Sequence, residues 1–301
     1  MTVLGIIIHL LLSSLLTAAP REKPAVAVVH NRLPAVASRL TVERDQNLPM
    51  PRITAEAAGV WDPLTRTWLF EQSADTQFPI ASITKLMTVL VVLDTQPDFD
   101  AELTIAQQDN DAPGARIPIP DGGRFRLRDL LAASLVASAN NTTEALVRAA
   151  GIDEADCVAR MNDRAARMGM LKSHFTDVTG LGPRNVSTIH DLAILAQAVF
   201  AYPEVASLTT TKEPTITDRA SGTPYRVVNT DQLVGSDLRV TAGKTGYTDA
   251  AGGALITRVK GIGERELFVL VLESAGRNDR FSDVRMLADW AFATFRWRGG
   301  A

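Results

Sequence analysis

Residues 78–95 read FPIASITKLMTVLVVLDT and place a lone serine and a lone lysine, Ser82 and Lys85, at the start of a long apolar run. A run that is apolar on every side predicts a buried helix. Side chains three positions apart are neighbours on a helix surface, so the hydroxyl of Ser82 and the amine of Lys85 could touch. The pair is either an ordinary helix N-terminus that meets water or a nucleophile beside its base.

Two β-prone regions flank a helical middle. Residues 55–72 (AEAAGVWDPLTRTWLFEQ) contain two short β-prone runs around a turn at Asp62 and Pro63, which predicts a hairpin. From about residue 100 to 200, apolar residues recur at three- and four-residue spacing, which predicts helices. The chain ends in three β-rich segments, VTAGKTGYT, GGALITRV and RELFVLVLES, and a predicted helix over 280–297. If both β regions share one antiparallel sheet, the helices form an insertion and the fold is α+β.

The N-terminal end predicts export. Residues 1–19 form an apolar run of secretory length that ends in small residues, as expected of a signal peptide or an uncleaved membrane anchor. Residues 20–53 carry five prolines without a sustained period and are interpreted as a tether, which places the folded domain at 54–301. We therefore expect a periplasmic or otherwise extracytoplasmic protein.

Bulk composition excludes several classes. A net charge of −3 over 301 residues gives no basic footprint for nucleic acid. The single cysteine, Cys157, excludes an intrachain disulfide and is expected to be buried and inert. The four histidines show no metal-ligand spacing, and His174 and His190 are interpreted as packing or surface residues. The sequence implies no metal and no organic cofactor.

Three short motifs together carry the chemistry. An S-x-x-K such as Ser82 to Lys85 is weak evidence alone. Downstream, Ser138-Ala139-Asn140 interrupts an apolar helical run, and Lys244-Thr245-Gly246 lies in a predicted strand. S-x-x-K, S-x-N and K-T-G in this order, with these separations and contexts, are a strong joint signal.

With these motifs, the sequence from about residue 54 onward resembles the serine penicillin-binding proteins and β-lactamases, and among them the small DD-peptidases of bacterial cell walls. The most similar type is the D-alanyl-D-alanine endopeptidase of the penicillin-binding protein 7 type. The stretches that carry this finer resemblance are HFTDVTGLGPRNVSTIHDL, YPEVASLTTTKE, YRVVNTDQLV and GKTGYTDAAGG. The resemblance implies a β-lactamase/transpeptidase-like fold, with peptidoglycan stem peptides and β-lactam antibiotics as binding partners.

A serine needs an adjacent base to act as a nucleophile, and Lys85 is the candidate base for Ser82 if its amine is neutral. A second cation, for which Lys244 is the candidate, would lower the pKa of Lys85. The resemblance implies that Ser138 relays a proton to the departing amine and that Asn140 orients Lys85 and the substrate amide.

The resemblance also implies how substrate is held. Lys244 and Thr245 would bind a terminal carboxylate, and Gly246 would leave room for the substrate backbone. The backbone N–H groups of Ser82 and Tyr247 would form the oxyanion hole. Residues 185, 187 and 229 (Asn, Ser and Asn) also match family stretches, but loop hydrogen bonds and capping explain them at least as well as catalysis does.

The motifs do not decide between the endopeptidase, the carboxypeptidase and related members of the family. No E-x-x-L-N string lies between Ser138 and Lys244, so we expect penicillin to acylate Ser82 and remain there. Endopeptidase and carboxypeptidase share their catalytic residues. The absence of a further β-rich domain and amphipathic tail before Ala301 favours endopeptidase, whereas the regular second motif favours carboxypeptidase. A β-lactam-sensing domain and a class A-like β-lactamase are more distant alternatives, and no G-x-S-x-G elbow supports a Ser-His-Asp hydrolase.

Overall fold

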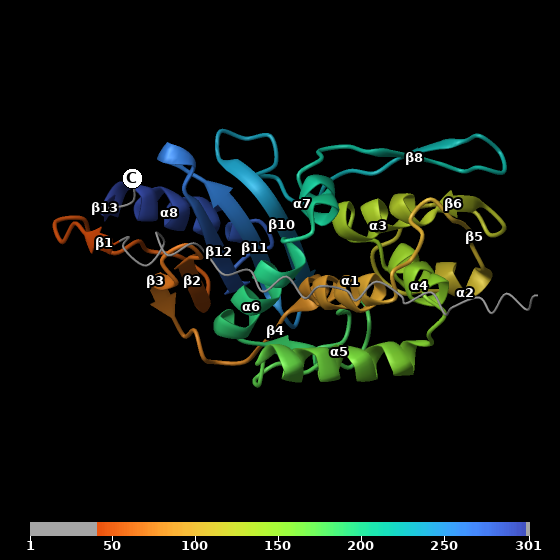
Figure 1. Cartoon of the computed structure of the whole chain (residues 1–301), viewed down its shortest axis with the longest axis horizontal. Helices are drawn as coiled ribbons and strands as arrows, with labels where there is room; N and C mark the ends of the chain where they lie inside the picture. The colour runs from red at the N-terminus through yellow and green to blue at the C-terminus, as the bar shows by residue number, and fades with distance from the viewer. Residues whose placement is uncertain (1–40, 299–301) are drawn as a thin grey trace, which may run out of the picture. The chain divides into compact units, whose positions relative to one another are not determined.

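The computed structural model of the chain describes residues 41–298 (Figure 1). The signal or anchor expected over residues 1–19, and the part of the expected tether before residue 41, lie outside these residues.

One five-stranded antiparallel sheet joins the two β regions, in the strand order β10-β11-β12-β2-β3. Its strands are β2 (Ala57–Asp62), β3 (Thr67–Gln72), β10 (Arg239–Thr248), β11 (Gly252–Lys260) and β12 (Glu266–Ser274). Strand β12 is the link, because it pairs with β2 in a register that places Val269 opposite Val60. The prediction of a shared sheet is confirmed, and with it the α+β class.

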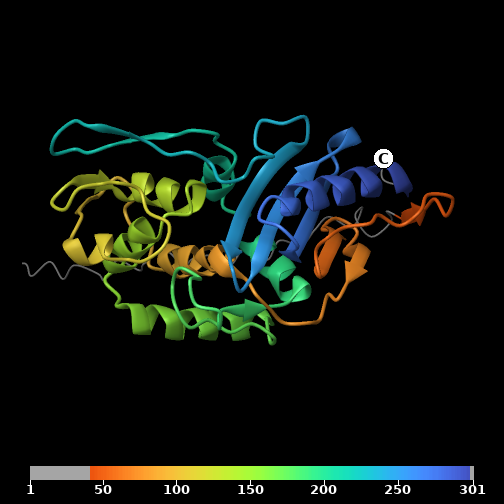
Figure 2. The ribbon, with the colours of Figure 1, turned by 180° about the vertical axis from the view of Figure 1, so that it is seen from behind.

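Helices cover both faces of this sheet, as Figures 1 and 2 show. Successive side chains of a strand point to opposite faces. On β12, Val269 packs in the core that contains α8 (Asp279–Thr294), whereas Leu270 packs in the core that contains α6 (Ile189–Val199). The near-continuous apolar runs of β11 and β12 follow from this burial on both sides.

The helical insertion lies between β3 and β10, and it is wider than the predicted span of 100–200 because helices at both of its ends belong to it. Its helices are α1 (Thr84–Asp94), α2 (Gln107–Asn110), α3 (Leu127–Val136), α4 (Asn140–Ala149), α5 (Glu154–Met168), α6 and α7 (Pro203–Thr209). Short strand pairs accompany them: β4 (Phe78–Pro79) with β7 (Val186–Ser187), β5 (Glu102–Thr104) with β6 (Arg124–Arg126), and β8 (Thr215–Thr217) with β9 (Pro224–Arg226). Among the described residues no single helix is long and apolar enough to cross a membrane; the pair α6 and α7, bent by 109°, meets the length and composition only jointly.

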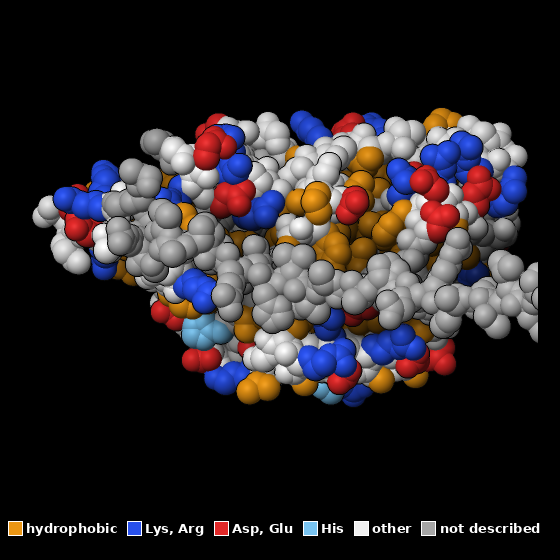
Figure 3. Space-filling model, in the orientation of Figure 1, with side chains coloured by type: hydrophobic (Ala, Val, Ile, Leu, Met, Phe, Trp, Pro, Cys, Tyr) orange, Lys and Arg blue, Asp and Glu red, His pale blue; other side chains and the backbone are white. Residues whose placement is uncertain are grey.

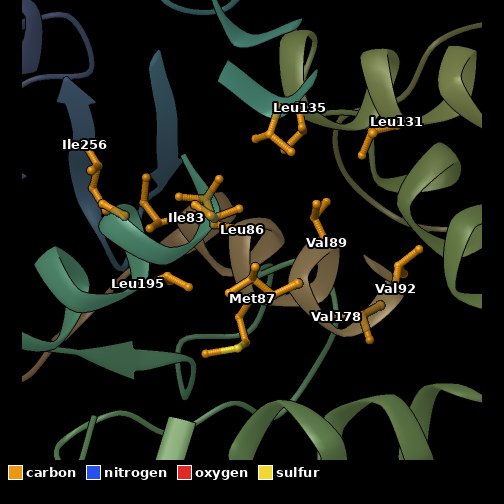
Figure 4. Packing of buried hydrophobic residues seen from close by; sticks show 14 of the residues in the cluster. Ile83, Leu86, Met87, Val89, Val92, Leu131, Leu135, Val178, Leu195 and Ile256 are labelled. Carbon is orange, nitrogen blue, oxygen red and sulfur yellow. The ribbon is translucent and has the colours of Figure 1, made fainter. Parts of the chain in front are cut away.

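Helix α1 lies at the centre of the insertion and is buried from Thr84 to Val92, as its apolar sequence predicts. In Figure 4, Met87 and Val89 of α1 belong to one buried cluster with Leu135 of α3 and Leu195 of α6. The short 3-10 helix η2 (Ala81–Ile83) precedes α1, so the motif serine stands immediately before this buried helix.

The folded body begins before residue 54, where the sequence placed its start. Strand β1 (Thr41–Arg44) pairs with β13 (Phe295–Arg298) at the other end of the described chain, and the carbonyl of Pro49 accepts a hydrogen bond of 2.9 Å from the indole of Trp290. The same pairing ends the last helix at Thr294, three residues before the predicted end at 297. Residues 41–53 are therefore part of the fold and not a free tether.

Charged side chains of both signs are interspersed over the described residues on the face shown in Figure 3. Ion pairs such as Arg226 with Glu213, at 2.6 Å, bring opposite charges together at the surface of the protein. Such mixing leaves no extended field of one sign on the described part of this face.

Candidate active site

Ser82 and Lys85 meet where the sheet joins the helical insertion. Ser82 belongs to η2 and Lys85 to the first turn of α1, and Lys85 Nζ lies 2.9 Å from Ser82 Oγ. The three-residue spacing thus brings the two groups into contact, as the sequence predicted. Lys85 is completely buried, so the solvated-lysine alternative is wrong.

Two further oxygen atoms hold the amine of Lys85. Asn140 Oδ1 lies 2.7 Å from Nζ and the carbonyl of Thr179 lies 2.8 Å from it. Asn140 is the first residue of α4, and its own Nδ2 donates to the carbonyl of Pro113 at 2.6 Å. Asn140 therefore orients Lys85 directly, as the resemblance implied. Thr179 was not identified from the sequence.

Asp177 holds the loop that carries the Thr179 carbonyl. One carboxylate oxygen accepts N–H bonds from Thr179 at 2.9 Å and Gly180 at 2.6 Å, and the other accepts from Gly182 at 3.0 Å and from the side chain of Asn185 at 2.5 Å. Burial alone would raise the pKa of Asp177, but the N–H donors, led by Gly182, hold it below its usual value. Asn185 therefore acts through this loop, which agrees with its structural interpretation.

Gly180 allows this loop to approach the nucleophile. Its φ is +80°, and an added Cβ would lie 1.9 Å from the carbonyl oxygen of Ala81, the residue before Ser82. Ala81 itself has a φ of 46°, a conformation that non-glycine residues rarely adopt. The backbone of the turn before Ser82 is therefore in direct contact with the loop that carries Thr179.

The second and third motifs meet on the other side of the nucleophile. Ser138 lies between α3 and α4 with a φ of 58°, and its Oγ accepts a hydrogen bond of 2.8 Å from Lys244 Nζ. Lys244 is in β10 and also donates to the carbonyl of Thr245 at 2.8 Å. All three motifs border one cavity of about 530 Å³, lined by Ser82, Ser138, Thr245, Gly246 and Tyr247 together with further residues described below.

Gly246 brings β10 close to the nucleophile. A Cβ at this position would lie 2.8 Å from the carbonyl oxygen of Ile80 and 3.2 Å from the side chain of Ala81. The glycine of the third motif is therefore required for contact between β10 and the turn before Ser82. It also lines the cavity, where the resemblance implied that it leaves room for substrate.

Burial shifts the pKa of both motif lysines downward. It lowers the pKa of Lys85 to about 7, while the charges of Asp177 and Glu144 act in the opposite direction. Burial also lowers the pKa of Lys244 well below its usual value, and the charge of Lys85 lowers it further. Desolvation, and not the charge of Lys244 as the sequence suggested, is thus the main cause at Lys85.

Several residues that line the cavity were not found from the sequence. Thr230 Oγ1 lies 2.6 Å from Thr245 Oγ1, and Arg280 donates to the carbonyl of Gly246 at 2.8 Å. Burial lowers the pKa of Arg280 to about 10, so it remains a cation at neutral pH. The remaining wall residues are Ala115, Ala137, Asn229, Gln232, Arg277 and Asn278.

Ser187 and Asn229, for which the sequence left a structural and a catalytic role open, have structural contacts. The side chain of Asn229 donates to the carbonyls of Thr209 and Thr211, both at 2.9 Å, although Asn229 also borders the cavity. Ser187 lies 2.7 Å from Ser173 Oγ.

Cys157 and His190 both lie within the described residues, in surroundings that fit a structural role. His190 lies at the surface between Glu71 and Asp75, at 2.7 and 3.2 Å. Burial raises the pKa of Cys157 to about 12, which makes its thiol inert, as expected. No group of three His, Cys, Asp or Glu side chains within residues 41–298 is arranged to hold a metal ion.

Comparisons with known proteins agree with this geometry. Residues 43–276 match the Peptidase S11 family, described as D-alanyl-D-alanine carboxypeptidase. The D-alanyl-D-alanine endopeptidase of Pseudomonas aeruginosa is 32% identical over 81% of this chain and 79% of its own length, and that of Escherichia coli K12 is 31% identical over 80% and 78%. The cefotaxime-bound penicillin-binding protein D2 of Listeria monocytogenes superposes with a TM-score of 0.71 at 31% identity, covering 81% of this chain and 100% of that one.

The family match spans most of the chain and includes all three motifs, and the relatives align over most of their own lengths. Within the structure, the motif residues converge on one cavity around Ser82. The chain therefore belongs to the Peptidase S11 family and is a serine-type D-Ala-D-Ala peptidase.

Proposed function

We propose that this chain is a D-alanyl-D-alanine endopeptidase that opens peptidoglycan cross-links through an acyl-enzyme on Ser82. The observation that carries the serine mechanism is the environment of Lys85, a buried amine in contact with Ser82 Oγ and two fixed acceptors. The similarity to relatives named endopeptidase, over about 80% of this chain, carries the subtype.

The contacts of Lys85 support a role as the base when its amine is neutral. A neutral amine has two N–H donors and one lone pair. Asn140 Oδ1 and the Thr179 carbonyl, at 2.7 and 2.8 Å, use both donors, which leaves the lone pair facing the Ser82 hydroxyl. Lys85 can then take the proton as Ser82 Oγ attacks the D-alanyl carbonyl carbon.

Other residues that line the Ser82 cavity, or contact its lining, would carry the remaining steps of the reaction. The N–H groups of Ser82 and Tyr247, which both border it, would stabilise the negative charge on the carbonyl oxygen. Ser138, held by Lys244 at 2.8 Å, is placed to pass a proton to the departing amine as the C–N bond breaks. Water then cleaves the Ser82 ester and regenerates the enzyme.

Positive charge on one wall favours a substrate carboxylate. Thr245 presents its hydroxyl to the cavity, and the cations Arg280 and Arg277 line the same space. These groups suit the carboxylate next to the scissile bond, whether it belongs to a free D-alanine or to a cross-linked residue.

The alternative is D-alanyl-D-alanine carboxypeptidase, which the family description and the regular Ser138-Ala139-Asn140 motif favour. Mass spectrometry of cross-linked muropeptide dimers and monomeric pentapeptides, incubated with the protein or with Ser82→Ala, separates the two. We expect dimers to fall to monomers only with intact Ser82. Shortening of pentapeptides by one D-alanine with intact dimers would establish the carboxypeptidase instead, and unchanged muropeptides would favour a sensing role.

We also propose that β-lactams acylate Ser82 and are released slowly. Among the described residues that line the Ser82 cavity there is no Asp or Glu to activate a deacylating water. The relative from Listeria, described in a cefotaxime-bound form, supports such binding. Since peptidoglycan lies outside the cytoplasm, we propose that the chain works in the periplasm or another extracytoplasmic compartment, exported by its N-terminal segment as a cleaved signal or as an anchor.

A further inference from the structure

A second cavity, of about 630 Å³, lies along the segment 110–121, which connects α2 to β6. This segment also contributes Ala115 to the wall of the Ser82 cavity, while the neighbouring Gly114 and Arg116 line the second cavity. One stretch of backbone thus separates the two spaces. The second cavity has no role in the mechanism above.

The second cavity carries two opposite charges that do not pair with each other. Arg116 and Asp121 both line it and are exposed. Both are held by Asn110: Arg116 Nη1 donates to the Asn110 carbonyl at 2.7 Å, and Asn110 Nδ2 donates to Asp121 Oδ1 at 2.7 Å. Asn110 therefore contacts both a guanidinium and a carboxylate, and both charged residues border the cavity and are exposed to solvent.

Two adjacent asparagines fix this segment to the catalytic centre. Asn140, which holds Lys85, donates from its backbone N–H to the Ala115 carbonyl at 2.6 Å. Asn141 donates to Asn110 Oδ1 and to the Ile117 carbonyl, both at 2.9 Å. The first turn of α4 thus connects Lys85 to residues 110, 115 and 117 of the segment between the two cavities, and a group bound in the second cavity is positioned relative to Ser82.

We propose that this cavity is a second substrate subsite that takes a zwitterionic amino-acid group, with its carboxylate at Arg116 and its ammonium at Asp121. A planar guanidinium matches a carboxylate, and an unpaired carboxylate matches an ammonium. Buried Ile117 and Ile119 supply apolar walls for the methylene chain that carries such a group.

The inference rests on the proposed function, because it places a branch of the donor stem peptide in this cavity. A diamino diacid such as meso-diaminopimelate at the third position of a stem ends in its own ammonium and carboxylate. Lysine at the same position ends in an ammonium alone. The subsite would therefore make the enzyme prefer stem peptides that carry diaminopimelate at the third position over those that carry lysine there.

The test measures how well peptides protect Ser82 from a fluorescent penicillin. Three pentapeptides ending in D-Ala-D-Ala differ only at the third residue: meso-diaminopimelate, lysine and acetyl-lysine. With the wild-type chain we expect the diaminopimelate peptide to inhibit about tenfold more strongly than the lysine peptide, the value of one charge-assisted contact. Arg116→Gln should remove this difference, and Asp121→Asn should bring the lysine peptide to the level of acetyl-lysine. Arg128→Gln, which alters an exposed arginine outside both cavities, is the matched control.

Equal inhibition by all three peptides in the wild type would overturn the inference, as would an Arg116→Gln variant that weakens all three alike. Melting temperatures within about 2 °C of the wild type, the shift expected for a small change in stability, show that the variants are folded, and each variant's inhibition is compared with its own labelling rate without peptide. Turnover of these pentapeptides and of cross-linked muropeptide dimers, followed by mass spectrometry, separates the two proposals. Selective protection with both pentapeptides and dimers left intact would refute the proposed peptidase activity and support the subsite, whereas cleavage of either substrate without selectivity among the three peptides would refute the subsite alone.

Discussion

Acylation of Ser82 should depend on pH through Lys85. Burial lowers the pKa of Lys85 to about 7, and the amine acts as a base only when it is neutral. With this pKa, the neutral fraction is about 0.9 at pH 8 and about 0.1 at pH 6. The sign is fixed by the type of group: a lysine becomes neutral as pH rises, so the rate should fall about tenfold from pH 8 to pH 6.

The assay is the second-order rate constant for labelling by a fluorescent penicillin between pH 5.5 and 9 at constant ionic strength. Two nearby carboxyl groups also titrate here, since burial raises the pKa of Glu144 to about 7 and that of Asp231 to about 6. The charge of Glu144 raises the pKa of Lys85, so Glu144→Gln should move the midpoint to lower pH. Asp231 acts on Lys244 and Arg280, so Asp231→Asn should leave the midpoint near 7. A flat profile, or a rate that rises on acidification, would refute the assignment of Lys85 as the base.

Two other outcomes follow from the geometry. Gly180→Ala should abolish labelling by the fluorescent penicillin and strongly lower the melting temperature, because its Cβ would lie 1.9 Å from the Ala81 carbonyl oxygen. The control is Gly169→Ala, which has a similar φ of +84° but open space around the added Cβ. This control should lower the melting temperature by only about 2–4 °C and keep full labelling. Wild-type labelling of Gly180→Ala would contradict this. Benzylpenicillin should add its whole mass to Ser82 and persist after free drug is removed, as intact-mass measurements can follow, whereas rapid turnover would indicate a β-lactamase.

Side-chain motifs made the residues that meet at the Ser82 cavity predictable, because the proposed nucleophile, base and cation need particular residue types. The three-residue spacing of Ser82 and Lys85 even fixed their contact, since both lie in one helical stretch. The third partner of Lys85 is the main-chain carbonyl of Thr179, and any residue can supply a carbonyl. The only sequence signal for it was the turn-rich stretch around Asp177, whose carboxylate satisfies the N–H groups of the loop.

The ends of the fold were harder to predict than its centre. Strand β1 has four residues, none of them buried, and pairs with residues about 250 positions away. No local period separates so short and exposed a strand from a linker. Strands β11 and β12 of the central sheet, by contrast, have nine residues each and are buried on both faces, so their apolar runs identified them.

The position of Lys85 explains why a buried helix begins with a serine and a lysine. A fall in pKa from 10.5 to about 7 corresponds to roughly 5 kcal/mol against the charged amine. Because the unfolded chain binds this proton more tightly, the cost is fully present below pH 7 and declines as pH rises towards 10.5. An exposed lysine would avoid the cost but would stay protonated at neutral pH and could not activate Ser82. The apolar helix α1 and the cores on both sides of it stabilise the fold enough to offset this cost, and the same burial supplies the neutral base.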